Sequence, residues 1–551
     1  MTDISNKVVV VGSGSAGFTA ALSAKEAGLE PMIVESTNLL GGSSAMSGGG
    51  LWVPNNPLML KAGVHDSYED AKLYLDRVIG DVGPASSPER REAFLREGPR
   101  MVEWLTQLGF RFSYTPGYAD YYPELPGGSV QGRSVEPDFF DLKQLGAWKN
   151  SLNILMPIPL HTLDAAQISL SFRSLSAFFH TAKVFGFRAI GSALLGKKLA
   201  GLGGALIGQL LYLALQREIP IWVNSPMVEL LYENDTVTGV IVEKEGQRTT
   251  LRASAVILAA GGFARNQAMR EQYHPHPITT QWTVATQGDL GVPIQAGMAI
   301  GAATALMDDA WWGPVFIDHK GTAQFMLWER SAPFGIIVDS SGKRFMNESA
   351  SYVDCGHWQY ECNQTAPAIP AFMIADSRHR KYYPFGMMLP GITPKAIYES
   401  GMLVKADSLR ELAQACNINP DNLEQTVQRF NQFAATGKDL DFHRGDSAYD
   451  RVYSDPRVKP NPNLGPVEKP PFFAVRVWPG DLGTKGGLLT DAAARVLRAD
   501  GSVIEGLYAA GNTSASVMGR TYPGPGSTIG PAMVFGMLAG EDAGRRAGKN
   551  G

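Results

Sequence analysis

Three short apolar runs along the chain each end in a glycine. They cover residues 8–11, 255–260 and 507–510, and none contains a charged residue. An uncharged run of this length before a turn residue is typical of a strand buried on both faces of a parallel sheet. The alanine-rich stretch 18–27 is predicted to be a helix, and residues 31–34 are predicted to form the next strand. The pattern predicts an α/β fold in which both ends of the chain contribute strands to one sheet.

The first apolar run leads into glycines with G-x-G-x-x-G spacing, at Gly12, Gly14 and Gly17. The first permits a tight turn, the second lets the backbone approach a pyrophosphate, and the third allows close packing of helix on strand. Glu35 ends the next strand, at the distance expected for a carboxylate that binds ribose hydroxyls. Together these features predict a Rossmann-like dinucleotide site. The contacts expected from this part of the chain are Gly12, Ser13, Gly14, Ser15, Ala16, Gly17, Glu35 and Ser36.

Further stretches of small residues favour FAD over NAD as the dinucleotide. Residues 40–50 follow the acidic strand, and their small side chains let the backbone pass close to a large planar ring. A last helix has Pro531 in its first turn, and its N-terminal dipole favours the negative charge of a reduced flavin. The further contacts expected with FAD are Gly41, Gly42, Ser43, Ser44, Ser47, Gly48, Gly49, Met227, Val228, Ala259, Ala260, Gly261, Gly511, Asn512, Thr528 and Ile529.

Over essentially its whole length the chain resembles the fumarate reductase/succinate dehydrogenase flavoprotein family. Members with covalently attached flavin carry a histidine in the early glycine stretch, where this chain has Ser43 and Ser44, so the resemblance implies non-covalent FAD. Asn512 stands where related flavoproteins usually carry an acidic residue, and its amide can still bond a ribityl hydroxyl or a phosphate.

The domain organisation expected is a parallel-sheet FAD-binding domain split in sequence. Residues 1–305 and 484–551 form it, and residues 306–483 form an inserted α+β substrate domain. The glycine-rich stretch 479–487 marks the return of the chain to the FAD-binding domain.

Charge and cysteine content exclude several classes of function. A net charge of −4 argues against general affinity for nucleic acid. The cysteines Cys355, Cys362 and Cys416 lack CxxC or metal-ligand spacing, so we expect free thiols and no metal site. The first strand begins near Lys7, which leaves no room for a signal peptide, and we expect a cytoplasmic protein.

One insertion, residues 146–198, combines apolar residues with sparse basic ones. Between residues 151 and 198 it carries five lysines and arginines against one aspartate. Two interpretations fit this composition: a segment bound to the surface of a membrane, on its inner face, or a helical lid or subunit contact. The uncharged run 199–216 contains four glycines and leads into a predicted strand, so we expect a core helix there and not a membrane span.

A tyrosine beside a glycine-rich turn narrows the chemistry. Flavin dehydrogenation of a C–C bond needs an adjacent polarised carbonyl and a base for the acidified proton. Tyr522 offers a hydroxyl, and the turn that follows it offers the amide of Gly526, so the two can form an oxyanion site. A structural turn with a packed tyrosine explains the same residues.

Residues 512–532, with Tyr522-Pro-Gly-Pro-Gly526 at their centre, resemble the 3-ketosteroid Δ1-dehydrogenases. In that family the tyrosine and last glycine of the turn hold the steroid C3 carbonyl. Residues 343–352 resemble the segment whose closing tyrosine, here Tyr352, takes the C2 proton. Residues 120–124 resemble the segment whose tyrosine assists; we favour Tyr121, with Tyr122 as the alternative register.

The resemblance implies FAD-dependent 1,2-dehydrogenation of a 3-ketosteroid, with hydride passing from C1 to flavin N5. An apolar basic insertion would suit sterols drawn from a membrane, such as cholest-4-en-3-one. The alternatives are a Δ4-(5α)-dehydrogenase, a fumarate or enoate reductase, and a flavin-containing membrane-surface protein without turnover. The sequence shows no second dinucleotide site, so we expect a quinone or another carrier as the electron acceptor.

Overall fold

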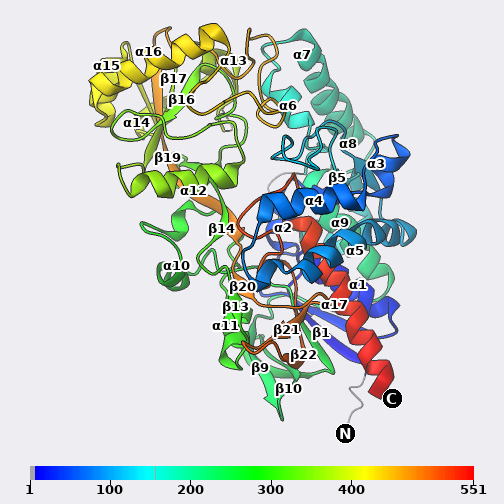
Figure 1. The fold of residues 1–551 in the computed structure, drawn as a ribbon. Helices are drawn as coiled ribbons and strands as arrows, with labels where there is room; N and C mark the ends of the chain where they lie inside the picture. The colour runs from blue at the N-terminus through cyan, green and yellow to red at the C-terminus, as the bar shows by residue number, and fades with distance from the viewer. Residues whose placement is uncertain (1–5, 155–156, 387, 551) are drawn as a thin grey trace.

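The computed structural model describes residues 6–154, 157–386 and 388–550, and its central element is a mainly parallel sheet. Strands from the two ends of the chain meet in it, and both termini lie at the same end of the molecule (Figure 1). The strand order is β11-β10-β22-β12-β1-β2-β8, with β9 and β21 added to β10 and β22. These strands are β1 (Lys7–Val11), β2 (Glu30–Val34), β8 (Ile221–Trp222), β9 (Met227–Glu233), β10 (Thr236–Lys244), β11 (Gln247–Arg252), β12 (Ala255–Leu258), β21 (Arg495–Leu497) and β22 (Val503–Ala509).

Both faces of β1 are buried, which explains its unbroken run of valines. Val8 and Val10 pack into one core, whereas Val9 and Val11 pack into a second core on the opposite face. The first core contains the helices α1 (Ser15–Glu26), α9 (Leu202–Gln216) and α17 (Ile529–Asn550). The second contains apolar side chains of the antiparallel strands β9 and β10.

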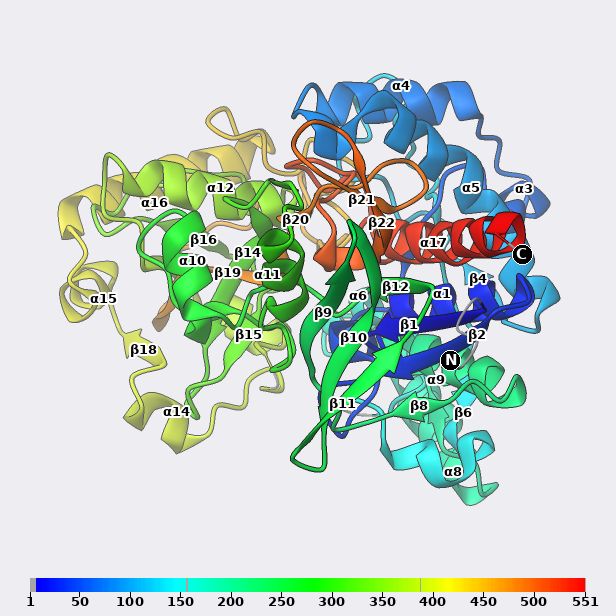
Figure 2. The same cartoon turned by 90° about the horizontal axis from the view of Figure 1, so that it is seen from below.

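Helices α1 and α17 lie side by side because small residues line their contact (Figure 2). A Cβ atom at Gly536 would lie 2.5 Å from the carbonyl oxygen of Ala16, and one at Gly540 would lie 2.6 Å from that of Ala20. The packing holds the two ends of the chain together beneath the glycine loop. Helix α1 begins three residues before the predicted start, because Gly14 adopts the extended conformation of an N-cap.

Residues 202–216 of the run 199–216 form α9, which is buried along most of its length, so the prediction of a core helix is confirmed. Of the helices that the structure describes, none is both long and apolar enough to cross a membrane.

A second, antiparallel sheet is formed by residues 310–484, within the part of the chain predicted as the inserted domain. Its strands are β14 (Ala310–Ile317), β15 (Ala323–Phe325), β16 (Gly335–Val338), β17 (Ala371–Ala375), β18 (Leu403–Ala406) and β19 (Phe472–Thr484). Helices α12 (Tyr352–Asn363), α15 (Leu409–Cys416) and α16 (Pro420–Thr436) pack around it (Figure 1). The chain then returns through β20 (Gly487–Leu488), which pairs with β13 (Thr304–Ala305).

The remaining elements are the longer helices α4 and α5 and a set of short helices and strands around these two sheets. They are α2 (Gly42–Met46), α3 (Pro57–Lys61), α4 (Tyr68–Ile79), α5 (Pro88–Gln107), α10 (Gln267–Tyr273), α11 (Val292–Ala299), α13 (Ser377–Tyr382), α14 (Lys395–Glu399), β3 (Leu51–Trp52), β4 (Phe112–Tyr114), β5 (Ser134–Pro137), β6 (Phe140–Asp141) and β7 (Leu199–Ala200), with the short turns η1 (Pro84–Ser86), η4 (Thr280–Trp282) and η5 (Gly511–Thr513).

The insertion 146–198 forms a chain of short helices, apart from residues 155 and 156, which lie outside the described residues. Its elements are η2 (Leu142–Asn150), α6 (Asp164–Ser169), α7 (Leu175–Ala182), η3 (Lys183–Gly191) and α8 (Ser192–Leu194). The carboxylate of Asp164 connects these helices, because it accepts hydrogen bonds from His180 (2.6 Å) and Arg188 (2.6 Å). Arg173 connects the insertion to Asp455, in the part of the chain predicted as the substrate domain, at 2.6 Å.

Candidate active site

The glycine loop has the geometry of a phosphate-binding turn. Gly12 has a positive φ of 106°, and a Cβ at Gly17 would lie 2.0 Å from the carbonyl oxygen of Gly12. Only glycine fits both positions. The N-cap residue of α1, Gly14, has no side chain, and the first turn contains no acidic residue. The amide of Ser15 donates to the Ser44 hydroxyl at 3.3 Å, whereas the amides of Ala16 and Gly17 are available to an anion, as a dinucleotide pyrophosphate requires.

Glu35 lies at the end of β2, beside this loop. Its carboxylate accepts hydrogen bonds from the Ser13 hydroxyl (2.6 Å) and amide (3.2 Å), and from the Ser36 hydroxyl (3.1 Å). The amide of Ser225 donates to the Glu35 carbonyl, which places the start of β9, with Met227 and Val228, next to this carboxylate. Residues predicted to contact the cofactor thus come together from two distant stretches of sequence.

The small residues after β2 surround a second part of the site. The hydroxyl of Ser44 lies 3.1 Å from that of Ser15, and the Ser43 hydroxyl accepts the amide of Thr286 at 3.0 Å. Cβ atoms at Gly42 and Gly48 would meet open space, with no atom closer than 3.9 Å. Gly41, Gly42 and Gly49 all have positive φ, but only Gly41 and Gly49 lie tightly against neighbouring atoms, and the Ser47 hydroxyl accepts a hydrogen bond from the amide of Gly49. The open positions fit a planar ring passing over this backbone.

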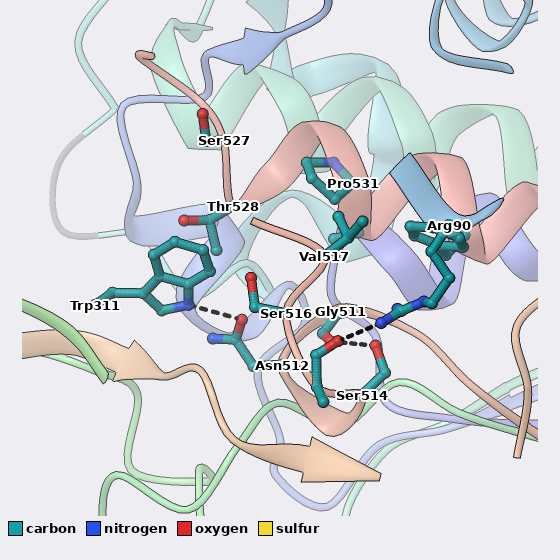
Figure 3. Close-up of a pocket in the computed structure, with 13 residues that line it drawn as sticks. Arg90, Trp311, Gly511, Asn512, Ser514, Ser516, Val517, Ser527, Thr528 and Pro531 are labelled. Carbon is teal, nitrogen blue, oxygen red and sulfur yellow. Dashed lines mark hydrogen bonds between the residues drawn. The ribbon is translucent and has the colours of Figure 1, made fainter. Parts of the chain in front are cut away.

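The third part of the site lies between β22 and α17 (Figure 3). A small pocket there is lined by Gly511, Asn512, Thr528 and the first turn of α17. The Asn512 side chain accepts a hydrogen bond from the indole of Trp311 at 3.1 Å. Ala259, Ala260 and Gly261 follow β12 on the other side of the glycine loop, where Gly12 contacts Ala259. Ile529 is the first residue of α17.

Three tyrosines from distant parts of the chain meet at the start of α17. The ring centroids of Tyr121 and Tyr522 lie 5.1 Å apart, those of Tyr352 and Tyr522 4.9 Å, and those of Tyr121 and Tyr352 5.5 Å. Tyr449 joins them, with its ring 4.0 Å from that of Tyr121. All four rings are buried. We call these four residues the tyrosine cluster.

The loop that carries Tyr121 is fixed against the turn that follows Tyr522. The amide of Tyr121 donates to the carbonyl of Pro523 at 2.9 Å, and the hydroxyl of Tyr74 donates to the same oxygen at 2.6 Å. The buried carboxylate of Asp120 accepts from the Trp52 indole and pairs with Arg133 at 2.8 Å. The preceding acid therefore anchors the loop, and Tyr121 projects into the tyrosine cluster.

The neighbouring Tyr122 points elsewhere. Its hydroxyl donates to the carboxylate of Asp354 at 3.0 Å. The structure therefore places Tyr121, the favoured register of the sequence analysis, with Tyr352 and Tyr522.

Gly526 occupies a position that only glycine can take. Its φ is +99°, and a Cβ there would lie 2.4 Å from the carbonyl oxygen of Gly50. The turn is closed by Ser527, whose hydroxyl accepts the amide of Gly524 at 2.9 Å. The hydroxyl of Thr528 lies 3.4 Å from that of Tyr522. Gly526 and Tyr522 thus lie at the same end of α17, next to the loop 47–50.

Burial disfavours ionisation of these tyrosines. It raises the pKa of Tyr352 and Tyr121 well above the ordinary value near 10. The hydroxyl of Tyr121 acts in the opposite direction and lowers the pKa of Tyr352 by hydrogen bonding. Tyr352 therefore depends on its neighbours if it is to accept a proton.

Several polar residues at this site were not predicted from the sequence. Lys485 is fully buried, its ammonium donates to the carbonyl of Thr521 at 3.1 Å, and burial lowers its pKa to about 8. Burial alone would raise the pKa of Asp309, but Lys485 and His357 outweigh it and hold that pKa at about 2. Arg330 lies beside Tyr449. These residues sit in irregular stretches, where no periodic pattern marks them.

The aromatic residues of β14 and β15 divide into two groups. The rings of Trp311 and Tyr522 pack edge to face with their centroids 5.3 Å apart, and those of Phe325 and Tyr352 do so at 5.1 Å. Trp312 instead packs on Tyr360, away from the tyrosine cluster. The alternation of β14 explains the split, since successive side chains of a strand point to opposite faces.

Comparison with known proteins agrees with this site. The FAD binding domain family matches residues 7–529. A 3-oxosteroid 1-dehydrogenase of Mycobacterium tuberculosis is 46% identical over 98% of this chain and 99% of its own length. The chain belongs to the 3-oxosteroid 1-dehydrogenase family. The predicted family, the α/β fold with its FAD-binding domain and the FAD cofactor are confirmed.

Two further relatives illustrate the range of the family. The crystal structure of 3-ketosteroid Δ1-dehydrogenase from Sterolibacterium denitrificans, in complex with 1,4-androstadiene-3,17-dione, has a TM-score of 0.93 and 37% identity, covering 98% of this chain and 100% of that one. The 4-oxocyclohexanecarboxylate 2-dehydrogenase of Sinomonas cyclohexanicum is 35% identical over 98% of this chain and 93% of its length. Relatives of this chain therefore include dehydrogenases named for a steroid and for a single-ring ketone.

Proposed function

We propose that this chain catalyses the FAD-dependent 1,2-dehydrogenation of 3-ketosteroids, converting a 3-keto-4-ene into a 1,4-diene. The observation that carries the proposal is the meeting of Tyr121, Tyr352 and Tyr522 beside Gly526 at the start of α17. FAD, held by the glycine loop, Glu35 and the small residues described above, supplies the acceptor for the C1 hydride when it is bound. The side chains of the cluster supply the acid–base chemistry.

Each residue has a separate role in this proposal. The Tyr522 hydroxyl and the Gly526 amide donate to the C3 carbonyl oxygen and stabilise the negative charge that develops there. Tyr352 then takes the acidified C2 proton, and the hydroxyl of Tyr121 supports its base form. Aromatic contacts from Trp311 and Phe325 give the site an apolar lining suited to a fused-ring ligand.

The ion pairs around the site argue against a dicarboxylate reductase. Such an enzyme needs arginines free to clamp substrate carboxylates. Arg344 is already engaged by Glu348 and Asp439, each at 2.8 Å. Arg330 donates to backbone carbonyl oxygens, including that of Ala350 at 2.8 Å. Both arginines are therefore occupied by the protein itself.

An anaerobic titration of the purified yellow protein tests the proposal. Androst-4-ene-3,17-dione and cholest-4-en-3-one are expected to bleach the flavin and yield 1,4-dien-3-ones, identified by mass and ultraviolet spectrum. A 5α-saturated 3-ketosteroid that yields only the 4-ene would assign the alternative Δ4 activity. Faster bleaching by 4-oxocyclohexanecarboxylate, or flavin turnover with fumarate and a reduced dye, would reject a steroid as the preferred substrate.

Electrons are proposed to leave the reduced flavin to a quinone or a similar carrier. The described residues contain one parallel sheet with one glycine loop, and FAD occupies that loop in this proposal. Mixing the steroid-reduced enzyme with a soluble quinone should restore the oxidised flavin spectrum rapidly. Equally rapid reoxidation by NAD would contradict this part of the proposal.

The insertion supports a second proposal, which concerns location. Nine of the eighteen exposed large apolar side chains of the described residues lie between Phe172 and Leu195. We call these nine the apolar patch: Phe172, Leu175, Phe178, Phe179, Phe185, Phe187, Ile190, Leu194 and Leu195. The exposed lysines Lys183 and Lys197 of the same segment accompany them, whereas Arg173 and Arg188 pair with Asp455 and Asp164. Apolar side chains together with basic residues are what binding to an anionic membrane surface requires, so we propose peripheral attachment to the inner face of the membrane.

Sedimentation with vesicles of two compositions tests this attachment. Vesicles containing an anionic phospholipid should carry the protein down, and neutral vesicles should carry down less at low salt. A dimer formed through the apolar patch would instead appear as a doubled mass in light scattering, with no sedimentation in either vesicle.

A further inference from the structure

Lys485 is a buried cation next to the segment that leads into Tyr522. It follows β19 directly, where the chain returns toward the FAD-binding domain. Among the lysines whose burial the structure describes, it is the one that is fully buried. A buried ammonium is costly unless its protons find partners. The partners of Lys485 therefore show what this position requires.

The three protons of this ammonium have three partners. Nζ donates to the carbonyl oxygen of Thr521 at 3.1 Å and lies 3.4 Å from the carboxylate of Asp309. It also lies 4.8 Å from the centre of the Trp311 ring, which is the distance of a cation–π contact. Because an ammonium has three N–H donors and no acceptor, these partners account for its full bonding capacity.

The carboxylate of Asp309 is held in place independently of Lys485. Its other oxygen accepts from the indole of Trp312 at 2.8 Å and lies 2.8 Å from the imidazole of His357. The backbone amide of Lys485 also donates to the carbonyl oxygen of Asp309, at 3.0 Å. The ammonium is therefore anchored at the start of β14 and reaches from there to the carbonyl of Thr521.

Hydrogen bonds fix the backbone on both sides of Tyr522. The carbonyl oxygen before it accepts from Lys485, and the one after it, of Pro523, accepts from the amide of Tyr121 at 2.9 Å. The ring of Tyr522 packs against Trp311, and Lys485 contacts that same indole. Lys485 thus holds both the backbone that precedes Tyr522 and an aromatic ring beside it.

We propose that Lys485 is a positioning residue that holds the hydroxyl of Tyr522 in the geometry required to bind a substrate carbonyl. Donors to a developing oxyanion are effective when they are pre-organised at the position where the charge appears. A displacement of about 1 Å is enough to lower a rate about 100-fold. The role rests on the proposed dehydrogenase function, in which Tyr522 donates to the C3 carbonyl oxygen. Lys485 acts through Tyr522 and does not touch the steroid.

The variant Lys485→Met tests this role in the FAD-loaded protein, because methionine has a similar shape without the donor or the charge. The value of kcat should fall about tenfold to 100-fold, with KM changed little. Lys485→Arg should recover part of the loss, since it restores a cationic donor. Combining Asp309→Asn with Lys485→Met avoids an unpaired buried carboxylate, so this variant keeps the test valid if Lys485→Met folds poorly, and it should show the same loss of kcat.

Arg520→Gln is the matched control for the loss of charge. Arg520 precedes Thr521, pairs with Asp308 at 2.9 Å and lies 4.0 Å from Asp309, whereas the Thr521 carbonyl accepts from Lys485. This variant removes a cation from the same segment and keeps that bond, so its kcat should equal that of the unmodified protein. A loss in Arg520→Gln as large as that in Lys485→Met would contradict a specific role for Lys485.

A double-substitution cycle shows whether Lys485 acts through Tyr522. Tyr522→Phe should lower kcat about 100-fold or more, the scale of a lost oxyanion donor. Adding Lys485→Met to Tyr522→Phe should cause little further loss, because the hydroxyl that it positions is already gone. An equal loss from Lys485→Met with and without that hydroxyl would overturn the proposal. Loss of FAD absorbance from Lys485→Met would also overturn it, since the ammonium would then serve the cofactor.

Two measurements without turnover separate this inference from the function it rests on. Hydrogen exchange of the amides of residues 518–528 and of Tyr121 should be faster in Lys485→Met than in Arg520→Gln or the unmodified protein. Unchanged exchange would refute the positioning, whether or not steroids bind. The infrared stretch of the C3 carbonyl of a bound 1,4-dien-3-one should move to lower frequency in the unmodified protein, and Lys485→Met should lose most of that shift. An unshifted carbonyl in the unmodified protein would instead reject carbonyl binding by Tyr522, and with it the proposed function.

Discussion

In the tyrosine cluster aromatic rings contact one another in the interior, beside the buried Arg330, whereas between Phe172 and Leu195 aromatic rings and Lys183 are exposed at the surface. The cluster draws its members from four separate stretches of chain, and the loop that carries Tyr121 is fixed by a backbone bond to Pro523. The apolar patch comes from one stretch of 24 residues, whose helices are joined through Asp164. Similar side chains thus serve chemistry in a pre-organised site and adhesion on a local surface.

The largest effect on catalysis is expected from removal of the proposed base, Tyr352. Tyr352→Phe should lower kcat for the steroid by about 10³-fold, because positioned acid–base groups contribute on this scale. Tyr360→Phe on the same helix is the control, since its hydroxyl contacts only the carbonyl of Pro277, at 3.3 Å, outside the cluster. Stopped-flow measurement of flavin bleaching gives the rate. A Tyr352→Phe rate within tenfold of the unmodified rate would remove Tyr352 from the mechanism.

The apolar patch should respond to substitutions that leave catalysis intact. Phe187 and Leu194 are 78% and 83% exposed, and replacing either by serine should weaken binding to anionic vesicles about tenfold. Leu440→Ser is the control, because Leu440 is 68% exposed but lies outside the insertion. Turnover of soluble androst-4-ene-3,17-dione should be unchanged in all three variants. Unaltered vesicle binding by the Phe187 and Leu194 variants would reject the patch as the contact.

The difference between features formed by contiguous residues and features assembled from distant ones also determines what can be predicted from the sequence. The FAD fold follows from local patterns, since the valines of β1 and the spacing of Gly12, Gly14 and Gly17 act within one strand–turn–helix unit. The insertion is also visible from composition, because its residues are contiguous. Tyr449 and Arg330 carry no such signal. Their meeting depends on how the second sheet places the loops around residues 330 and 449 against Tyr121, which tertiary packing alone determines.

The buried His274 should make the free energy of unfolding depend on pH. Burial and the neighbouring Arg270 lower the pKa of His274 to about 4, whereas the unfolded chain binds this proton near pH 6.5. Between these values the unfolded state binds more protons, so stability falls as pH falls through this window. At pH 5 the His274 contribution to this loss is about 2 kcal/mol. Urea unfolding at pH 7 and pH 5 should show a smaller loss for His274→Gln than for the unmodified protein.

The control for this prediction is His443→Gln. The side chain of His443 is exposed, and its neighbour Asp446 lies 3.5 Å away at the surface. Its removal should leave the dependence of unfolding free energy on pH unchanged. A His274→Gln protein that loses as much stability as the unmodified one would assign the acid sensitivity to other groups, such as the buried His379, whose pKa is also lowered to about 4 by burial.

The smallest expected effect concerns Asp164, which joins the helices beneath the apolar patch. Asp164→Asn keeps the shape but removes the charge that accepts from His180 and Arg188, at a cost of about 1 kcal/mol because water can reach these partners. Limited proteolysis should therefore cut the insertion faster, while steroid turnover and FAD content stay unchanged. The tyrosine cluster would not tolerate an equivalent loss, since water cannot replace a partner there. If turnover fell together with protease resistance, the insertion would be coupled to the active site and the two regions would form one functional unit.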